Sequence, residues 1–191
     1  MVHHLPSASH GLVLTVPEDT SSPAQQQTRP PGRGRSYSRL MDPFEDCFVC
    51  DKHTRGDEVP GGVIYDDGIV YAGHTHPMAT ADAALGYLMV EPRRHVPRLG
   101  DLTDEEASSM GVVANRLSRV LRTTLGAEHV YSFVFGDRVP HLHVHLAPRY
   151  PNAPEEVFGL GATGIQHSPD VPRGGPSEIQ DVCDRLRAAL P

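Results

Sequence analysis

The sequence holds few cysteines, no excess of positive charge and no long apolar run, and each shortage excludes a class of protein. Three cysteines in 191 residues cannot build the disulfide framework of a small secreted domain. The expected compartment is therefore the reducing cytoplasm. No apolar stretch approaches the ~18–20 residues that a membrane-spanning helix needs, and a net charge of -7 argues against a basic face for nucleic acid. We expect neither a membrane nor a nucleic acid as a partner.

Residues 1–40 also lack apolar periodicity, and proline, glycine and small polar residues fill them instead. Such a segment buries too little apolar surface to offset the entropy lost on ordering. We predict a disordered tail over residues 1–40, with Met41, where compact sequence begins, as an alternative start of the chain. A domain over residues 41–150 follows, and then an extension over residues 151–191 that ends in a helix. Residues 151–176 of this extension are expected to be irregular.

Hydrophobic periodicity predicts an antiparallel sheet with a long helix packed on it, which is an α+β fold. Asp66-Asp67-Gly68 lies between two short apolar segments, 63–65 and 69–71, and is typical of a tight hairpin turn. Further strands are expected at residues 85–90, 130–135 and 141–147.

Capping signals mark the predicted helices. Thr103 and Glu106 form a capping box at the start of an apolar stripe with helical spacing, and Gly126 ends that stripe. Ser177 and Gln180 are the expected cap of the terminal helix.

The strongest motif is His141-Leu142-His143-Val144-His145-Leu146, in which histidine alternates with aliphatic residues. Because residues i, i+2 and i+4 of a strand point to one face, the three imidazoles are predicted to line one surface. Neighbouring histidines then lie about 6.7 Å apart at Cα and the outer pair about 13 Å apart, so all three cannot easily share one metal ion. At least one imidazole is free to act as a nucleophile or acid–base group near neutral pH. The alternatives are a solvent-facing strand with incidental histidines and a simple metal-storage patch.

The second motif is Cys47-Phe48-Val49-Cys50, which alone fits a redox pair, half of a zinc site or coincidence. Redox motifs of this spacing occur within a thioredoxin-like pattern, which this sequence does not show. A zinc site is therefore favoured, and it needs two further ligands. His53 is a reserve ligand or else an exposed loop residue, and His74 and His76 are expected to be loop histidines near the rim of the active site.

With Pro148-Arg149 after the third histidine, the triad resembles that of the histidine triad (HIT) superfamily, and the resemblance extends from about Phe44 to Tyr150. Along this stretch a Cys-x-x-Cys start, a hairpin, a Pro-x-x-His segment, a helix and the triad strand follow the family order. Members hydrolyse or transfer nucleotides at the α-phosphate through a nucleotidyl-histidine intermediate, and they are commonly homodimers. The resemblance therefore implies an enzyme that acts on a nucleoside phosphate anhydride, ester or phosphoramidate, with a small-molecule nucleotide as its substrate.

The resemblance also implies roles for the histidines. The middle one, His143, is the nucleophile, and His145 contacts the phosphate and the leaving group. Backbone amides of the turn before the triad, and an arginine on either side of it, are candidates to stabilise phosphate oxygens. Either arginine is equally well interpreted as an ordinary surface charge. The candidate phosphate-binding residues are Gly136, Asp137, Arg138, His145 and Arg149.

Branches of the family with a Cys-x-x-Cys start bind zinc through both thiolates, the histidine of the Pro-x-x-His segment and the first triad histidine. The resemblance therefore implies a structural zinc held by Cys47, Cys50, His95 and His141. Two thiolates and two imidazoles make a closed tetrahedral site of the structural type.

Three places depart from the family pattern, and they bear on nucleoside specificity. His74 lies near the place of a ribose-binding aspartate, Tyr87 stands where many members have a histidine, and Val134-Phe135 occupy the neighbourhood of an amide side chain. These departures motivate an alternative function, a nucleotide-binding regulatory module with weak or no catalysis. A further alternative is a metallohydrolase with His141 and His143 on a catalytic zinc.

Overall fold

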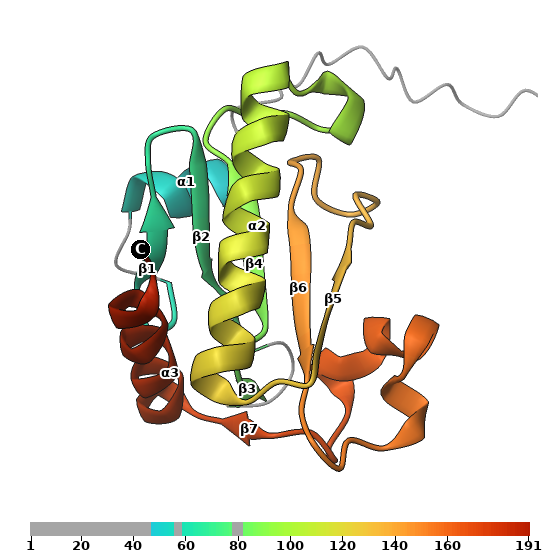
Figure 1. Cartoon of the computed structure of the whole chain (residues 1–191). Helices are drawn as coiled ribbons and strands as arrows, with labels where there is room; N and C mark the ends of the chain where they lie inside the picture. The colour runs from blue at the N-terminus through green and yellow to red at the C-terminus, as the bar shows by residue number, and fades with distance from the viewer. Residues whose placement is uncertain (1–46, 56–58, 78–81) are drawn as a thin grey trace, which may run out of the picture. The chain divides into compact units, whose positions relative to one another are not determined.

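The computed structural model describes residues 47–55, 59–77 and 82–191. The expected tail, residues 1–40, lies outside the described residues. All described residues belong to one unit of the chain, Leu40–Pro191. Within this unit a single large sheet carries helices on both of its faces (Figure 1).

The large sheet has five strands, all antiparallel to their neighbours, in the order β1-β2-β4-β6-β5 (Figure 1). The sheet and the long helix packed on it confirm the predicted α+β fold. The strand 85–90 is shifted, because the chain turns at Gly86 and the ladder then continues through Pro92. The strands are β1 (Val63–Asp66), β2 (Val70–His74), β4 (Leu88–Pro92), β5 (His129–Phe133) and β6 (Val144–Arg149).

The β1–β2 hairpin forms at the predicted turn. Gly68 adopts a φ of 84°, a conformation that a residue with a Cβ atom rarely takes. Oδ1 of Asp67 accepts the N–H groups of Ile69 and Val70 at 2.9 and 2.7 Å. The turn is therefore fixed by a glycine and a carboxylate, which are the residue types that its sequence signature rests on.

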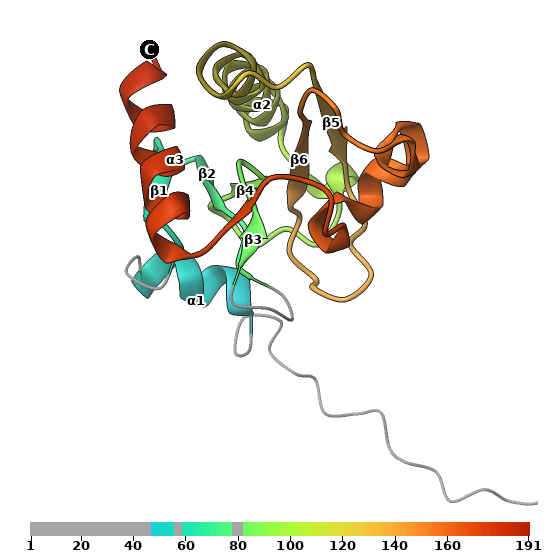
Figure 2. The ribbon, with the colours of Figure 1, turned by 90° about the horizontal axis from the view of Figure 1, so that it is seen from below.

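Two helices, α2 (Asp104–Leu125) and α3 (Pro176–Ala189), cover one face of the sheet (Figure 2). The predicted capping box opens α2, because Thr103 Oγ1 accepts the Glu106 N–H at 3.2 Å and the Glu106 carboxylate accepts the Thr103 N–H at 2.8 Å. Gly126 ends α2 in the left-handed conformation. The main core lies between these helices and the sheet, and it includes Val70, Leu88, Val90, Val113, Leu117, Leu121, Leu142, Leu146, Ile179 and Leu186.

The terminal helix α3 begins earlier than predicted. Its first residue is Pro176, whose missing N–H costs nothing at the first helical position. The N–H of Gly175 donates to the Glu178 carboxylate at 3.1 Å and closes the first turn. Ser177 and Gln180, the expected cap residues, therefore lie inside the helix.

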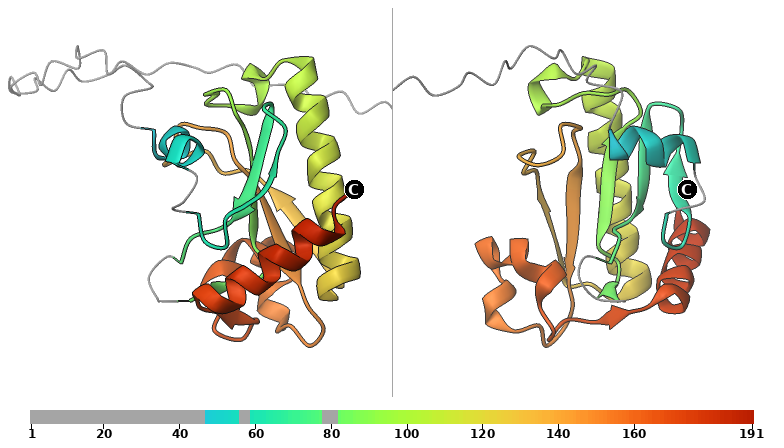
Figure 3. Two further views of the ribbon diagram at one scale, coloured as in Figure 1. Left: turned by 90° about the vertical axis from the view of Figure 1, so that its left-hand side faces the viewer. Right: turned by 180° about the vertical axis from the view of Figure 1, so that it is seen from behind.

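The opposite face of the sheet carries α1 (Phe48–Arg55) and a 3-10 helix, η3 (Gly159–His167) (Figures 2 and 3). Neither helix is predicted from the sequence, and residues 151–176 are more regular than expected. The remaining short elements are β3 (Ala83–Ala84), η1 (Leu99–Asp101), η2 (Glu155–Val157) and β7 (Arg173–Gly174), and β3 pairs with β7.

A second, smaller apolar cluster holds η3 against the sheet. Ala162 and Ile165 of η3 are each 1% exposed and belong to one cluster with Tyr87 of the sheet region. At nine residues, η3 is long for a 3-10 helix, which is uncommon beyond three or four residues. Gly161 permits the close approach of η2, because a Cβ atom there would collide with the carbonyl of Glu156.

Within the described residues, no helix combines the length and the apolar character needed to cross a lipid bilayer.

Candidate active site and metal site

The ladder of β6 begins later than predicted, at Val144. His141 and His143 precede it because Leu142, which lies between them, donates its N–H to the carbonyl of Val96 at 2.6 Å instead of to β4. The alternation of side chains nonetheless continues through the segment, since Leu142 enters the main core. The histidines consequently point to the face that α1 and η3 cover.

His141 belongs to a partly buried cluster with Cys47, Cys50 and His95, in which the four ligand atoms lie within 4.8 Å of one another. Nδ1 of His141 lies 3.5 Å from both sulfur atoms, and Nδ1 of His95 lies 3.4 Å from Cys50 Sγ. A tetrahedral zinc with Zn–S of about 2.3 Å and Zn–N of about 2.0 Å separates sulfur and nitrogen ligands by about 3.5 Å. The spacing therefore fits a zinc ion, and the four residues are those that the sequence predicts.

The surroundings of the cluster also suit a cation. Nε2–H of His141 donates to the carbonyl of Pro92 at 2.9 Å, which leaves Nδ1 as the lone-pair nitrogen that faces the sulfurs. Burial and the adjacent Cys47 thiol raise the pKa of Cys50 to about 12. Two thiolates side by side therefore need a cation, and His143 contributes no atom to the group. This composition disfavours a catalytic zinc on the triad.

His53 lies beside the cluster without joining it. The structure corrects the expectation of an exposed loop residue, because His53 lies on α1 and is buried. Its Nε2 is 3.0 Å from the Glu91 carboxylate, which Lys52 also reaches at 2.6 Å. Burial alone would raise the pKa of Glu91, but the hydrogen bond from His53 and the charge of Lys52 lower it. This trio ties α1 to β4 and so supports the cysteines.

His143 is half-buried and its ring orientation is fixed by the backbone. Nδ1 lies 2.7 Å from the carbonyl oxygen of His141, so Nδ1 carries the proton and donates it to that oxygen. Nε2 consequently carries the lone pair of the ring. His143 therefore has a tautomer in which Nε2 could act as a nucleophile.

His145 is held by aromatic residues. The ring of Phe133 stacks on it at 5.0 Å between centroids, and Nδ1 lies 3.0 Å from the Tyr87 hydroxyl. Burial and the neighbouring His143 lower the pKa of His145 to about 4, so its imidazole is neutral near pH 7. Because burial raises the pKa of Tyr87, its hydroxyl keeps its proton and donates to Nδ1. Nε2 of His145 is then an N–H donor, and it has no hydrogen-bond partner among the described residues.

Two hollows meet at His143. The first has a volume of about 350 Å³ and is lined by His143, His145, the turn before the triad and η3. The second has a volume of about 270 Å³ and lies toward α1 and the end of β2. The residues shared by both hollows are Thr75, Met89, Val139 and His143. A molecule bound across this junction would place one of its atoms beside the proton-free nitrogen of His143.

A protein family model described as "HIT domain" matches residues 57–152, which is half of the chain. The chain belongs to the HIT domain family. The family assignment agrees with the resemblance of the triad and with the antiparallel sheet that carries it.

Curated relatives of this HIT protein match it to different extents. "Protein hit" of Bacillus subtilis is 25% identical over 151 residues, which cover 76% of this chain and 95% of the relative. The nitrilase and fragile histidine triad fusion protein of Caenorhabditis elegans is 37% identical over 71 residues, and a bis(5'-adenosyl)-triphosphatase of Dictyostelium discoideum is 33% identical over 69. These two matches span only 16% and 46% of the relatives' own lengths.

Solved structures show the same fold. A zinc-bound histidine triad family protein from Mycobacterium smegmatis superposes with a TM-score of 0.55 at 23% identity, covering 76% of this chain and 93% of that one. A histidine triad nucleotide-binding protein from Sulfolobus tokodaii gives a TM-score of 0.57 at 17% identity, with coverages of 75% and 91%.

The candidate phosphate-binding residues of the HIT domain divide into two groups. Gly136, Asp137 and Arg138 line the first hollow together with His143 and His145. Arg149 does not line it, because its guanidinium stacks on the ring of Phe158 at 4.2 Å and lies 3.4 Å from the carboxylate of Glu128. The position of Arg149 therefore fits the alternative interpretation of a surface charge.

His74 and His76 are not equivalent. The structure corrects the expectation of a loop residue for His74, which is the last residue of β2 and only 2% exposed. Its Nδ1–H donates to the Thr75 carbonyl, its Nε2 accepts the Gly86 N–H at 3.1 Å, and burial lowers its pKa to about 4. Both histidines line the second hollow, and the ring of His76 lies 5.6 Å from that of Phe48, between centroids, in an edge-to-face arrangement.

Several lining residues lie beyond what the sequence indicates. Thr163, Gln166 and His167 reach the first hollow from η3, outside the residues that the HIT domain model matches. Phe48 and Lys52 reach the second hollow from α1. The family resemblance singles out Tyr87 only because many members have a histidine at its position. No sequence pattern indicates its hydrogen bond to His145.

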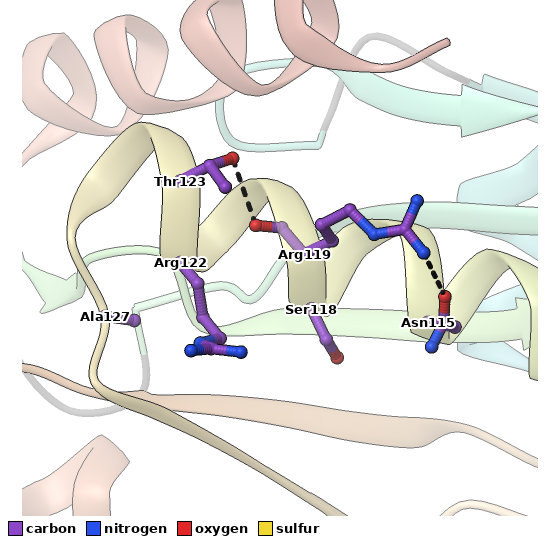
Figure 4. A pocket seen from close by; sticks show the side chains of 6 residues that line it. All are labelled: Asn115, Ser118, Arg119, Arg122, Thr123 and Ala127. Atoms are coloured by element: carbon purple, nitrogen blue, oxygen red, sulfur yellow. Dashed lines mark hydrogen bonds between the residues drawn. The ribbon is translucent and has the colours of Figure 1, made fainter.

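A third hollow, of about 390 Å³, lies on the outer side of α2 (Figure 4). Arg119 and Arg122 line it, and Arg119 donates to the Asn115 side chain at 3.2 Å. It shares no residue with the two hollows at His143, so it contributes nothing to the candidate active site.

Proposed function

We propose that this HIT protein is a nucleotide hydrolase or nucleotidyltransferase that acts at the α-phosphate of a nucleoside phosphate anhydride, ester or phosphoramidate. The observation that carries the proposal is the hydrogen bond from His143 Nδ1 to the His141 carbonyl at 2.7 Å. This bond leaves the lone pair of Nε2 available at the junction of two hollows. A substrate with two parts joined by a phosphoryl group matches that arrangement.

The proposed reaction has two displacements at phosphorus. Nε2 of His143 attacks the α-phosphorus, a P–N bond forms, and the bond to the leaving group breaks with its electron pair on the leaving atom. Water or another acceptor hydroxyl then attacks the same phosphorus and releases its proton. The P–N bond breaks with its electrons returning to Nε2, which restores the free histidine.

His145 and Tyr87 assist in this scheme without forming a bond to phosphorus. The Tyr87 hydroxyl donates to Nδ1 of His145, so Nε2–H of His145 can donate to a phosphoryl or leaving-group oxygen. Donors that are held in place before the reaction stabilise charge as it develops, because they need no reorganisation. Tyr87 thus acts as a positioning residue in place of the histidine that many family members have there.

The remaining walls suggest how the substrate lies. Gly136, Asp137 and Arg138 line the first hollow and can bring backbone amides and one positive charge to phosphate oxygens. In the second hollow, Phe48 is 55% exposed and offers an aromatic surface to a flat base. We place the nucleoside in the second hollow and the leaving group in the first.

We assign a structural role to zinc at Cys47, Cys50, His95 and His141. A bound zinc ion would supply the charge that holds both cysteines as thiolates, and its four ligands would join α1 to the segment that precedes His143. The chain's own residues carry every chemical step of the proposed mechanism.

The names of relatives support the nucleotide substrate. Besides the Dictyostelium triphosphatase, a relative from Schizosaccharomyces pombe is named a bis(5'-nucleosyl)-tetraphosphatase. A homodimer and a cytoplasmic location belong to the same proposal. The dimer rests on the family resemblance, and the location rests on the three cysteines, none of which forms a disulfide.

Substitution of the nucleophile tests the proposal. His143→Ala should abolish turnover of dinucleoside polyphosphates and nucleoside phosphoramidates, while the melting temperature and the zinc content stay at wild-type values. His129→Ala, which removes an exposed histidine of β5, is the matched control and should keep full activity. Full activity of His143→Ala on both substrate classes would refute the mechanism.

A regulatory module that binds nucleotides with weak or no catalysis is the second candidate, favoured by Tyr87 at the place of a family histidine. It predicts nucleotide binding by calorimetry without multiple turnovers in any of the substrate classes. Measuring both quantities on the same preparation separates the two functions.

A further inference from the structure

One wall of the first hollow is built by the extension that follows the matched HIT domain. Thr163, Gln166 and His167 on η3 line this hollow together with His145. η3 is anchored, because Ile165 is buried in the second apolar cluster. Figure 2 shows this segment beside β5 and β6, on the side of the sheet away from α2.

The backbone of η3 is clamped at its far end as well. Nη1 of Arg173 donates to the carbonyl of Gln166 at 2.9 Å, and Nη2 of the same guanidinium donates to the carbonyl of Asp82 at 3.1 Å. One arginine thus ties the wall of the hollow to the segment that leads into β3. The wall has a defined position relative to the triad.

Gln166 is the buried polar side chain of this wall, with 7% of its surface exposed. Its Nε2 donates to the carbonyl of His76 at 3.2 Å. A carbonyl can only accept, so this bond fixes which end of the amide is nitrogen and which is oxygen. Oε1 therefore points away from His76, is itself buried, and has no hydrogen-bond partner among the described residues.

A buried amide oxygen without a donor is unfavourable, and a ligand that supplies a donor removes that penalty. We infer that Gln166 is a specificity-determining residue, whose Oε1 accepts a hydrogen bond from an O–H or N–H group of the leaving group. This inference rests on the proposed function. Gln166 shares its hollow with His145 and not with Phe48, which places it on the leaving-group side of His143.

An acceptor at this position selects among leaving groups by their chemistry. A sugar, a second nucleoside or an amine carries hydroxyl or amino donors that match Oε1. The oxygens of ionised pyrophosphate offer only lone pairs and would face Oε1 unfavourably. The structure thus favours leaving groups that carry a hydroxyl or amino donor over pyrophosphate.

Two substrates with the same adenosine 5′-phosphoryl part test this inference. Diadenosine triphosphate has ribose hydroxyls in its leaving group, whereas the p-nitrophenyl ester of adenosine 5′-monophosphate has no donor there. Gln166→Met removes the acceptor at nearly constant volume, and it also removes the N–H bond to the His76 carbonyl, a loss that both substrates share. Gln180→Met makes the same chemical change on the exposed side of α3 and is the matched control.

For Gln166→Met we expect kcat/KM to fall about tenfold on diadenosine triphosphate, the size of one hydrogen bond, and to stay within about twofold on the ester. Gln180→Met should change neither value. Should Gln166→Met not fold, as judged by its thermal melt, Gln166→Leu makes the same removal in a smaller side chain.

Equal losses on both substrates, or no loss on diadenosine triphosphate, would overturn the inference and leave the proposed function standing. A wild type that turns over neither substrate, and that forms no covalent adduct, would overturn the proposed function itself and the inference with it. The two failures therefore give different patterns across wild type and variant.

Discussion

The two faces of the sheet differ in how their contacts are made. On one face, α2 and α3 pack regular apolar stripes onto the strands, and residues such as Leu117 and Leu146 are fully buried there. On the other face, the site is assembled from α1, the end of β2, the turn before the triad and η3. The first face is therefore built from repeated apolar contacts of regular elements, whereas the candidate site on the second face depends on segments that lie far apart in the sequence.

The largest effect is expected at the metal cluster of Cys47, Cys50, His95 and His141. Cys50→Ser should bring the zinc content, measured by elemental analysis, from about one ion per chain to nearly none, because one of four ligands is lost. We expect a fall in melting temperature larger than that caused by any single apolar substitution. Cys183→Ser, at a buried cysteine of α3 outside the cluster, should keep its zinc.

The converse pattern would contradict this account of the metal. If Cys50→Ser kept its zinc while His143→Ala lost it, the ion would sit on the triad and the metallohydrolase alternative would stand.

On the face that α2 and α3 cover, Leu117→Ala should lower the free energy of unfolding by about 2–5 kcal/mol, because it leaves a cavity in the main core. Chemical denaturation measures this loss. The kcat/KM of the folded fraction should stay at the wild-type value, since α2 lines neither hollow at His143. A large fall in kcat/KM with intact folding would show that the two faces are coupled.

Ile165→Ala makes the corresponding change under η3. We expect a smaller loss of global stability than for Leu117→Ala, because η3 can open locally while the sheet stays folded. KM for a substrate with a large leaving group should rise, since the wall of the first hollow loosens. An unchanged KM together with increased hydrogen exchange in η3 would show that this wall of the first hollow does not contribute to substrate binding.

The smallest effect is expected at Tyr87. Tyr87→Phe removes the hydrogen bond to His145 and should cost about 1 kcal/mol, which corresponds to roughly a fivefold lower kcat with little change in KM. Tyr87→His, which restores a ring nitrogen at that position, should recover part of the loss. A Phe variant with a raised KM and a normal kcat would indicate that Tyr87 contacts the substrate and does not orient His145.

What could be predicted from the sequence follows the same division. The capping box at Thr103, the hairpin turn at Gly68 and the apolar stripe of α2 are local signals, and the structure confirms each of them. Their physical causes lie within a few residues of each element, so periodicity and turn chemistry suffice to place them.

The four metal ligands lie far apart in the sequence, and they could be predicted only because the family resemblance supplies the whole set. The structure brings all four together. The contacts of His53 with Glu91, of Tyr87 with His145 and of Gln166 with the first hollow were not predicted. Each of them joins segments that come together only in the tertiary fold, and no local pattern encodes such a meeting. The late start of β6 also depends on a tertiary contact, since the carbonyl of Val96 accepts the N–H of Leu142.

The most direct test of the central claim is the mass of the covalent intermediate. Wild-type protein mixed with an adenosine 5′-phosphoryl substrate and quenched in base should gain the mass of one adenylyl group, which peptide mapping should place on His143. His143→Ala should gain no such mass. Turnover by the wild type without an adduct, or an adduct on a residue other than His143, would contradict the account.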